Sequence, residues 1–295
     1  MGLPFLNPYM ESLGAPNFHH GCNFAAGGAS VLPSNSPRFP FSFRIQVNQF
    51  TRFKARAIHL QAKEDKLREY LPPEDYFTRG LYVLDFGQDD VDVAFGSKSE
   101  DQVLAFIPTI LSEFESGIQR LYNEGARNFW ILNIGPLGCI PRIIVNYGKN
   151  ASNLDELGCV RSHNHACRIY NNQLRDLCTK IRTQFPDANV TYVDIFSIKW
   201  NLISKFSQYG FKEPLAACCG YGGPPVNFDT RIACGVTMDL NGTTVTANAC
   251  TNTSEYVNWD GNHYTEAANR HVTEQILAGN YTDPPLSMGH MQIHG

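Results

Sequence analysis

Unbroken apolar segments that alternate with amphipathic helical segments constrain the fold of this chain more than any other feature. Residues 79–87, 128–135 and 189–196 are short apolar runs of the kind that form buried strands. Between them, apolar residues recur at three- and four-residue spacing over 107–121 and 166–181. Buried strands separated by helices are typical of a parallel sheet that helices cover on both faces. The sequence therefore predicts an α/β fold.

Short signals mark the ends of the expected helices. Residues 99–102 read Ser-Glu-Asp-Gln, a capping box at the start of the first helix, and Gly125 is suited to end that helix. A last helix is expected over residues 265–278, with Thr265 as its N-cap and Gly279 as its C-cap.

The rest of the chain adds one expected strand and one irregular region. Residues 21–25 are predicted to form a further strand. Residues 210–258 are rich in Cys, Gly and Asn without a clear period, so we expect a long excursion tied by disulfides. The sequence shows no internal repeat and no dividing linker. We therefore expect residues 1–295 to form a single domain that contains the excursion 210–258.

The composition argues against two classes of partner. The formal net charge of −4 gives no electrostatic reason to expect binding to nucleic acid. The sequence contains no run of about 18 apolar residues, so we expect no membrane span. With 43% hydrophobic residues, the chain can bury a sizeable core.

Cysteines and glycosylation motifs favour an oxidising compartment. Nine Cys occur, and four of them crowd near the end of the chain, at Cys218, Cys219, Cys234 and Cys250. The Asn-x-Ser/Thr acceptors are Asn150, Asn189, Asn241, Asn252 and Asn280. This combination predicts a secreted, disulfide-containing glycoprotein.

The N-terminal sequence does not fit that prediction. MGLPFLNPYMESLG has no basic region followed by a sustained apolar stretch, so it is not a signal peptide. We therefore expect the full protein to begin upstream of this sequence, and we expect its export signal to lie there.

A metal site is not predicted. No Cys-x-x-Cys pair occurs, and His163-Asn-His165 is not completed by a cluster of carboxylates or cysteines. Histidines at the surface or at the start of a helix are the favoured interpretation of this pair. The chain also has no Walker loop and no Gly-x-Gly-x-x-Gly motif, so we expect no cofactor.

Three segments carry side chains suited to binding or chemistry. In open α/β sheets, ligands lie beyond the carboxyl ends of the strands. The segments placed there, or just before the last helix, are NFAAGGAS (23–30), GQDD (87–90) and WDGNH (259–263). Each also has an ordinary interpretation when it is taken alone. Gly27-Gly28 can be a tight turn, Asp89-Asp90 a solvated or capping pair, and Asp260-x-x-His263 a surface loop.

The order of these segments resembles that of the plant GDSL (SGNH) hydrolases. Residues 21–29 resemble the second conserved block of that family, and residues 85–90 resemble the third, which reads Gly-x-Asn-Asp. Residues 259–269 resemble its Asp-x-x-His block. Further likeness to the plant branch lies at 133–141, 218–223 and 283–285. The likeness covers nearly the whole chain and is closest to the early-nodulin-type esterases, which are often labelled α-L-fucosidases.

This resemblance implies a fold and a reaction. The fold is a flavodoxin-like three-layer α/β/α sandwich, and the reaction is hydrolysis of acyl or acetyl esters of lipids, glycans or secondary metabolites by Ser, His and Asp without a cofactor. By motif match, His263 is the base, Asp260 orients it, and the Gly28 N–H is one donor of the oxyanion hole. The implied partner is a small-molecule or glycan ester, and the implied location of the full-length protein is the cell wall or apoplast.

Two departures from the family pattern concern the chemistry itself. No Gly-Asp-Ser, the block that carries the nucleophile in the family, occurs in the chain, and Ser30 is the nearest local candidate. That block aligns upstream of residue 1, so we expect the first strand to be missing between the strands at 21–25 and 79–86. In addition, Asp89 stands where the family has its oxyanion Asn, and an ionised carboxylate has no proton to donate.

These departures leave three hypotheses for the function of the chain. It is a truncated form of an ester hydrolase, or a secreted pseudoenzyme that binds a glycan or ester without hydrolysis, or the product of a misassigned start with no function of its own. Asp89 favours the second hypothesis, because truncation alone does not explain a substitution in another block.

Overall fold

The computed structural model describes residues 4–11, 13–33 and 40–285. Within these ranges the chain folds into two compact units, neither of which is a continuous stretch. The first unit is formed by residues up to 97, by 105–132 and by 172–192, and the second by 98–104, 133–171 and the residues from 193 onward. Residues 1–3 and 12 of the N-terminal segment lie outside the described residues.

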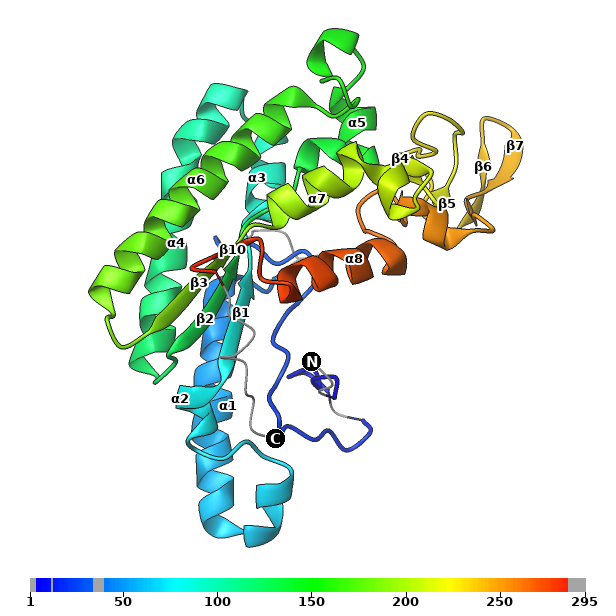
Figure 1. Cartoon of the computed structure of the whole chain (residues 1–295). Coiled ribbons are helices and arrows are strands. Elements are labelled where there is room, and N and C mark those ends of the chain that lie inside the picture. Colours follow the sequence, from blue (N-terminus) through cyan, green and yellow to red (C-terminus); the bar gives the residue numbers. More distant parts are fainter. Residues whose placement is uncertain (1–3, 12, 34–39, 286–295) are drawn as a thin grey trace. The chain divides into compact units, whose positions relative to one another are not determined.

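The helices and strands follow one another along the chain as Figure 1 labels them. The helices are α1 (Phe43–Lys63), α2 (Tyr76–Arg79), α3 (Gln88–Phe95), α4 (Glu100–Asn123), α5 (Pro141–Tyr147), α6 (Arg161–Gln184), α7 (Ile195–Ser204) and α8 (Glu266–Leu277). The strands are β1 (Leu81–Asp85), β2 (Asn128–Leu132), β3 (Asn189–Val193), β4 (Glu213–Ala217), β5 (Cys219–Gly220), β6 (Thr237–Leu240), β7 (Thr243–Thr246), β8 (Asn248–Ala249), β9 (Tyr256–Asn258) and β10 (Thr282–Asp283).

The first unit is built on the strands that the apolar runs predict. β1 pairs in parallel with β2, with Val83 opposite Trp130, and β3 is the next neighbour of β2 (Figure 1). Phe129 and Ile131 point to one face of β2 and Trp130 to the other, and all three are buried, as expected for a strand with both faces covered. The predicted α/β fold with a largely parallel sheet is confirmed.

The segment 21–25 does not form the predicted strand. Its pairing is an isolated bridge, in which the Tyr9 N–H donates to the Asn23 carbonyl over 2.8 Å and the Asn23 N–H donates to Asn7 over 2.9 Å. A strand needs a partner edge along its length, and only residues 7–9 supply one here. The segment is therefore a loop with one bridged residue.

Helix α1 is the longest helix that the sequence analysis did not predict. It buries Phe43, Val47 and Phe50, which lie three and four residues apart on one face. The Phe50 ring meets Tyr82 of β1 at 5.4 Å between centroids, and Phe43 meets Phe114 of α4 at 5.0 Å. Aromatic packing thus holds α1 against β1 and α4.

The predicted helix ends are confirmed in detail. The Ser99 N–H donates to Gln102 Oε1 over 3.0 Å, and the Gln102 N–H donates to Ser99 Oγ over 3.4 Å, which is the reciprocal pair of a capping box. Thr265 Oγ1 accepts from the Ala268 N–H at the start of α8. Gly125 follows α4 and adopts φ +105°, a conformation that favours glycine.

The second unit contains the excursion 210–258, and disulfides tie it as expected. Cys218 bonds to Cys250 and Cys219 to Cys234, while Cys139 bonds to Cys159 outside the excursion. The excursion also has regular structure that the sequence did not predict. β6 and β7 form an antiparallel hairpin, β5 pairs with β8, and β4 pairs in parallel with β9.

Candidate active site

The Asp-x-x-His segment lies in the second unit, in the loop between β9 and α8. The Trp259 N–H donates to the His263 carbonyl over 2.7 Å, which closes the loop on itself. Thr265 ends the loop, with its hydroxyl donating to the Tyr256 carbonyl over 2.7 Å. Backbone and cap bonds therefore fix both ends of the five-residue stretch that holds the aspartate and the histidine.

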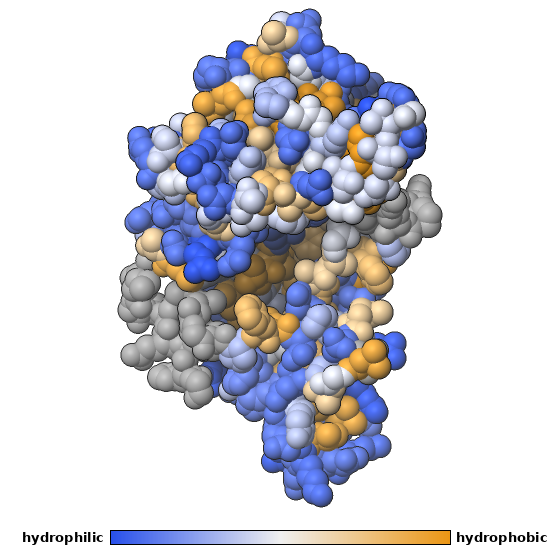
Figure 2. Space-filling view, turned by 90° about the vertical axis from the view of Figure 1, so that its right-hand side faces the viewer, coloured by the Kyte–Doolittle hydropathy of each residue, from blue (hydrophilic) through white to orange (hydrophobic). Residues whose placement is uncertain are grey.

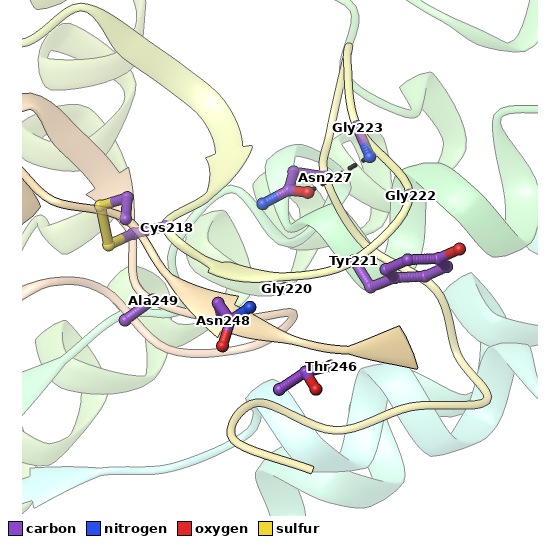
Figure 3. Close-up of a pocket in the computed structure, with 10 residues that line it drawn as sticks. Cys218, Gly220, Tyr221, Gly222, Gly223, Asn227, Thr246, Asn248 and Ala249 are labelled. Atoms are coloured by element: carbon purple, nitrogen blue, oxygen red, sulfur yellow. Dashed lines mark hydrogen bonds between the residues drawn. A yellow bond between two sulfur atoms is a disulfide. The ribbon is translucent and has the colours of Figure 1, made fainter. Parts of the chain in front are cut away.

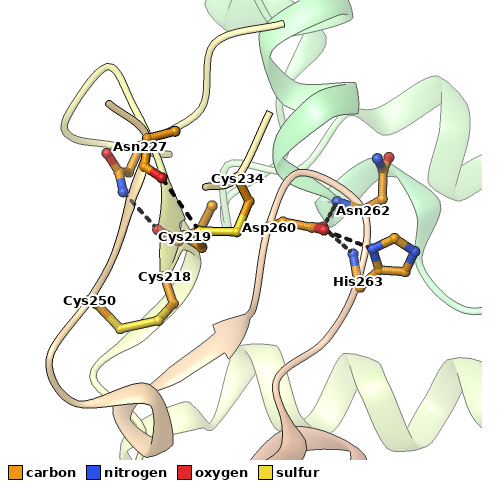
Figure 4. Close-up of a disulfide and its surroundings, with 10 residues drawn as sticks. Cys218, Cys219, Asn227, Cys234, Cys250, Asp260, Asn262 and His263 are labelled. Atoms are coloured by element: carbon orange, nitrogen blue, oxygen red, sulfur yellow. Dashed lines mark hydrogen bonds and ion pairs between the residues drawn. A yellow bond between two sulfur atoms is a disulfide. The ribbon is translucent and has the colours of Figure 1, made fainter. Parts of the chain in front are cut away.

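Asp260 and His263 are in direct contact. Asp260 Oδ2 lies 2.8 Å from His263 Nδ1, and Asp260 Oδ1 accepts the backbone N–H groups of Asn262 and His263 at 2.7 and 2.8 Å (Figure 4). The two backbone bonds hold the carboxylate in place, so the third bond fixes the plane of the imidazole ring. Nδ1 is engaged, and Nε2 is the ring nitrogen left to exchange a proton with another group.

The two side chains of this pair differ in how far they are exposed to solvent. The side chain of His263 is 75% exposed, whereas that of Asp260 is 22% exposed. Burial acts to raise the pKa of Asp260, but the hydrogen bonds from His263 and from two backbone amides outweigh it and lower that pKa. Asp260 is therefore ionised at neutral pH and can orient the imidazole and stabilise its cation.

Two disulfides support the strand that leads into this loop. The Cys218 N–H donates to the Asn258 carbonyl over 3.0 Å, and the Cys219 N–H donates to the Trp259 carbonyl over 2.6 Å. Cys218 and Cys219 also form the two excursion disulfides, which Figure 4 draws in the same view as Asp260. The backbone that precedes Asp260 is thus tied to the most cross-linked part of the second unit.

Gly28 and Asp89 lie in the first unit, where both line one groove of about 520 Å³. Gly28 adopts φ +72°, which a glycine takes without strain. Asp89 lies in the first turn of α3, after Gly87 at φ +109°. The structure thus brings together Asp260 with His263 in one unit, and Gly28 with Asp89 in the other.

The neighbour of Asp89 has a structural role that the sequence did not reveal. Asp90 is buried, and its carboxylate accepts the Val31 N–H at 2.8 Å and the Leu32 N–H at 3.0 Å. Burial raises the pKa of Asp90, and the backbone hydrogen bonds oppose that effect. Asp90 therefore holds the loop that follows Gly28 against α3. Of the two adjacent acids, only Asp89 lines the groove.

The groove is lined mainly by apolar side chains. Residues 80–86, which include all of β1, form one wall, and α1 contributes Phe43, Val47, Phe50 and Phe53. Residues 20–29, with the exception of Gly27, contribute most of the rest. Figure 2 shows hydrophobic surface in a hollow on the face that it presents. No transmembrane helix is present among the described residues.

A second pocket, of about 440 Å³, lies in the excursion around Tyr221 and Asn248 (Figure 3). Its amide side chain Asn227 is used by the fold. Asn227 Oδ1 accepts the Gly223 N–H at 3.2 Å, and Nδ2 donates to the Ala217 carbonyl over 2.9 Å. This amide therefore shapes the loop.

Two other candidates from the sequence have local structural partners. The Ser30 hydroxyl donates to the Leu32 carbonyl over 2.6 Å. His163 and His165 lie in the first turns of α6, as expected, where His165 Nδ1 is 2.7 Å from Glu100. His163 is buried, and burial together with the charge of Arg142 lowers its pKa to about 4. The described residues contain no group of three potential metal ligands.

Comparison with known proteins decides the family. The sequence model of the GDSL-like lipase/acylhydrolases matches residues 2–276. This chain belongs to the GDSL lipase/acylhydrolase family. A GDSL esterase/lipase of Arabidopsis thaliana is 53% identical over 97% of this chain and 77% of its own length. The GDSL esterase/lipase ENOD8 of Medicago truncatula is 40% identical over 97% of this chain and 74% of its own length.

Family membership confirms the resemblance on which the motif assignment rests, including its likeness to early-nodulin-type proteins. The α/β sandwich implied by that resemblance agrees with the sheet and helices observed. Sequence reasoning did not identify helix α1 or the groove beside β1, which Gln46 of α1 also lines. The apolar spacing of Phe43, Val47 and Phe50 was the signal that could have revealed that face.

Proposed function

We propose that this chain carries the acid–base part of an ester-hydrolysing site, with His263 as the general base and Asp260 as the group that orients it. The observation that supports the proposal is the 2.8 Å contact between Asp260 Oδ2 and His263 Nδ1 within the Asp-x-x-His segment. In such a site the imidazole Nε2 takes a proton from an attacking hydroxyl and later returns it to the leaving alcohol.

The substrate class we propose is a carboxylic ester, namely an acyl or acetyl ester of a lipid, a glycan or a secondary metabolite. The names of the relatives, esterase/lipases, support this class. The chemistry requires neither a metal nor an organic cofactor, because a hydroxyl nucleophile, a base and hydrogen-bond donors suffice.

We further propose that residues 1–295 do not turn over esters by themselves. The sequence contains no Gly-Asp-Ser, and Asp89 stands at the position of an oxyanion donor. Removal of one such donor costs about 100- to 1000-fold in rate. Ser30 is a poor substitute for the nucleophile, because its proton is already donated to Leu32.

A paired experiment tests both parts of this proposal. With p-nitrophenyl acetate, the chain and its His263→Ala variant are expected to give equal, background rates. Nitrogen NMR of His263 at neutral pH is expected to find the proton on Nδ1, and the Asp260→Asn variant should lose that preference. Turnover clearly above the His263→Ala control would contradict the proposed inactivity. An Nε2-protonated ring would contradict the proposed base.

The second candidate function is a pseudoenzyme that binds a glycan or ester without hydrolysis. The specific observation that favours it is Asp89, a substitution in a block that the sequence retains. Calorimetric titration with acetylated xylo-oligosaccharide and with its deacetylated form separates the two functions. Binding of the acetylated form that survives His263→Ala, without acetate release, would favour the pseudoenzyme.

Secretion of the full-length protein, to the cell wall or apoplast, is a further proposal. Its support is the set of three disulfides and the exposure of all five acceptor asparagines, Asn150, Asn189, Asn241, Asn252 and Asn280. Asn241 lies in the turn of the β6–β7 hairpin, and Asn252 precedes a short turn in the same excursion.

Export behind a supplied signal peptide tests this proposal. At least two glycans are expected, on Asn241 and Asn252, and the Asn241→Gln, Asn252→Gln variant should migrate faster by two glycans. An unchanged mobility after treatment with a glycan-removing amidase would count against secretion.

A further inference from the structure

The orientation of the His263 ring depends on hydrogen bonds rather than on packing. The side chain of His263 is 75% exposed, so few neighbours restrict the rotation of its ring. The ring is oriented by Asp260 Oδ2, which lies 2.8 Å from Nδ1. The carboxylate is held in turn by the backbone N–H groups of Asn262 and His263, which it accepts. A group that fixes residues 261–262 therefore fixes the imidazole through Asp260.

Arg142 bonds to both of these residues from a different element. Its backbone N–H donates to the Gly261 carbonyl over 3.1 Å, and its Nε donates to Asn262 Oδ1 over 2.5 Å. Arg142 is the second residue of α5, and the N–H groups in the first turn of a helix have no partner within that helix. The bond to Gly261 satisfies one of these groups, so the start of α5 and the site loop stabilise each other.

The side-chain bond from Arg142 restrains a residue that packing leaves free to move. The side chain of Asn262 is exposed. A guanidinium group is always charged and offers donors only, so the amide oxygen of Asn262 has to face it. Charge-assisted hydrogen bonds are roughly twice as strong as those between neutral groups. The bond therefore restrains Asn262 and, with it, the N–H group that Asp260 accepts.

Arg142 is itself held by a cross-linked segment of the second unit. The disulfide between Cys139 and Cys159 lies just before α5 in the sequence. Pro141 begins the helix, and Ile143 in its first turn is fully buried. A side chain mounted on such a segment keeps its place when an exposed loop moves, which is the requirement for a group that positions another.

An aromatic ring of the excursion packs against the same turn of the loop. Gly261 is buried, and a Cβ atom on it would overlap the ring of Phe228. The turn between Asp260 and His263 is thus held by contacts from two other segments, α5 and the excursion. Of these contacts, only the bonds from Arg142 carry a charge.

We propose that Arg142 is a positioning residue of the acid–base site, which holds Gly261 and Asn262 so that Asp260 keeps the proton of His263 on Nδ1. Nε2 is then the nitrogen that accepts a proton. This inference rests on the proposed function of Asp260 and His263. Arg142 acts through the loop and does not itself touch the reacting atoms.

The tautomer of His263 is the direct readout. Nitrogen NMR of the neutral ring, with labelled histidine, gives the ratio of the Nδ1-protonated to the Nε2-protonated form. Arg142→Met keeps the apolar stem of the side chain and the backbone bond to Gly261, but it removes the Nε donor. This variant is expected to lower the ratio by about threefold or more. A role in stability alone would leave the ratio in the folded protein unchanged.

Three further variants locate the effect in one bond, and near-ultraviolet circular dichroism confirms that each is folded. Asn262→Leu breaks the bond from its exposed end and is expected to lower the ratio to a similar extent. The double variant Arg142→Met, Asn262→Leu should fall no further than either single variant, because both remove the same bond. Arg161→Met is the matched control, since its Nε likewise donates to one oxygen, the Leu154 carbonyl, over 2.8 Å, outside this loop. Its ratio is expected to equal that of the unchanged chain.

The outcomes distinguish this inference from the function on which it rests. An unchanged chain with His263 protonated mainly on Nε2 would contradict the proposed base itself. A chain protonated on Nδ1, in which Arg142→Met and Asn262→Leu give the same ratio as Arg161→Met, would overturn the positioning role alone. Losses that multiply in the double variant would also overturn it, because they would show that the two side chains act independently.

Discussion

At the scale of single residues, the structure separates two adjacent acids that the sequence presents as a pair. Asp90 is buried and accepts two backbone N–H groups, so it holds a loop. Asp89 lines the groove beside Gly28. Asp89, and not Asp90, is therefore the acid whose carboxylate replaces a neutral amide donor at the groove.

The first prediction concerns Asp89. In a chimera that carries a Gly-Asp-Ser segment, Asp89→Asn is expected to raise the rate of ester hydrolysis by about 100-fold or more, because it restores a neutral hydrogen-bond donor. Initial rates on p-nitrophenyl acetate measure the gain. Asp90→Asn is the control and should lower stability rather than raise the rate. A chimera that is already fast with Asp89 would show that this carboxyl is protonated or uninvolved.

The second prediction concerns Asp260 and pH. Its pKa is lowered in the folded state, so its stabilising effect is present above its unfolded pKa of about 3.9 and is lost as the pH falls through the folded value. Asp260→Asn keeps an acceptor for the backbone amides but removes the charge beside His263. Urea unfolding is expected to show a loss of about 0.5 kcal/mol at pH 7 that disappears toward pH 3. A difference that grows with acidity would contradict this sign.

At the scale of elements, the disulfides and the site loop form one connected structure. β4 pairs with β9, and the residues that follow β4 donate to the backbone that precedes Asp260. A change in the disulfides should therefore affect the loop that orients His263.

The third prediction follows from the 32-residue separation of Cys218 and Cys250. Replacing both by Ser is expected to lower the free energy of unfolding by about 3–4 kcal/mol, on the chain-entropy account of cross-links. Denaturant unfolding measures the loss, and limited proteolysis should locate new cleavage within 218–250. The Cys139→Ser, Cys159→Ser variant, with a 20-residue separation, is the comparison and should be cleaved elsewhere. Unchanged stability of the Cys218→Ser, Cys250→Ser variant would contradict the prediction.

At the scale of the whole molecule, β1 is the edge of its sheet among the described residues, and that edge influences the expected behaviour. Unpaired strand edges and exposed apolar side chains such as Val83 promote association between chains. Because a typical domain has only about 5–15 kcal/mol of net stability, the contacts along one strand edge are a large fraction of the total.

The fourth prediction is that the chain self-associates through the edge of β1. Size exclusion is expected to give species larger than a monomer, and thermal melting a broad transition below about 50 °C. Val83→Lys should reduce association, and Val93→Lys, at a residue that is exposed but lies outside the groove, should not. A soluble monomer with one sharp transition above about 50 °C would contradict the prediction.

Helices α4, α6 and α8 and the contact between Asp260 and His263 were determined by the sequence itself, because their signals are local. The capping box at 99–102, the cap at Thr265 and a three-residue step between carboxylate and imidazole act within one or two turns of chain. Only the tertiary structure decided that 21–25 is a loop, which cysteines pair, and that Gln46 is buried with no acceptor for its Nε2 in the part of the chain that the structure describes. Those outcomes depend on which distant segments supply a partner edge, a second sulfur or a hydrogen-bond acceptor, and sequence spacing carries no information about such contacts.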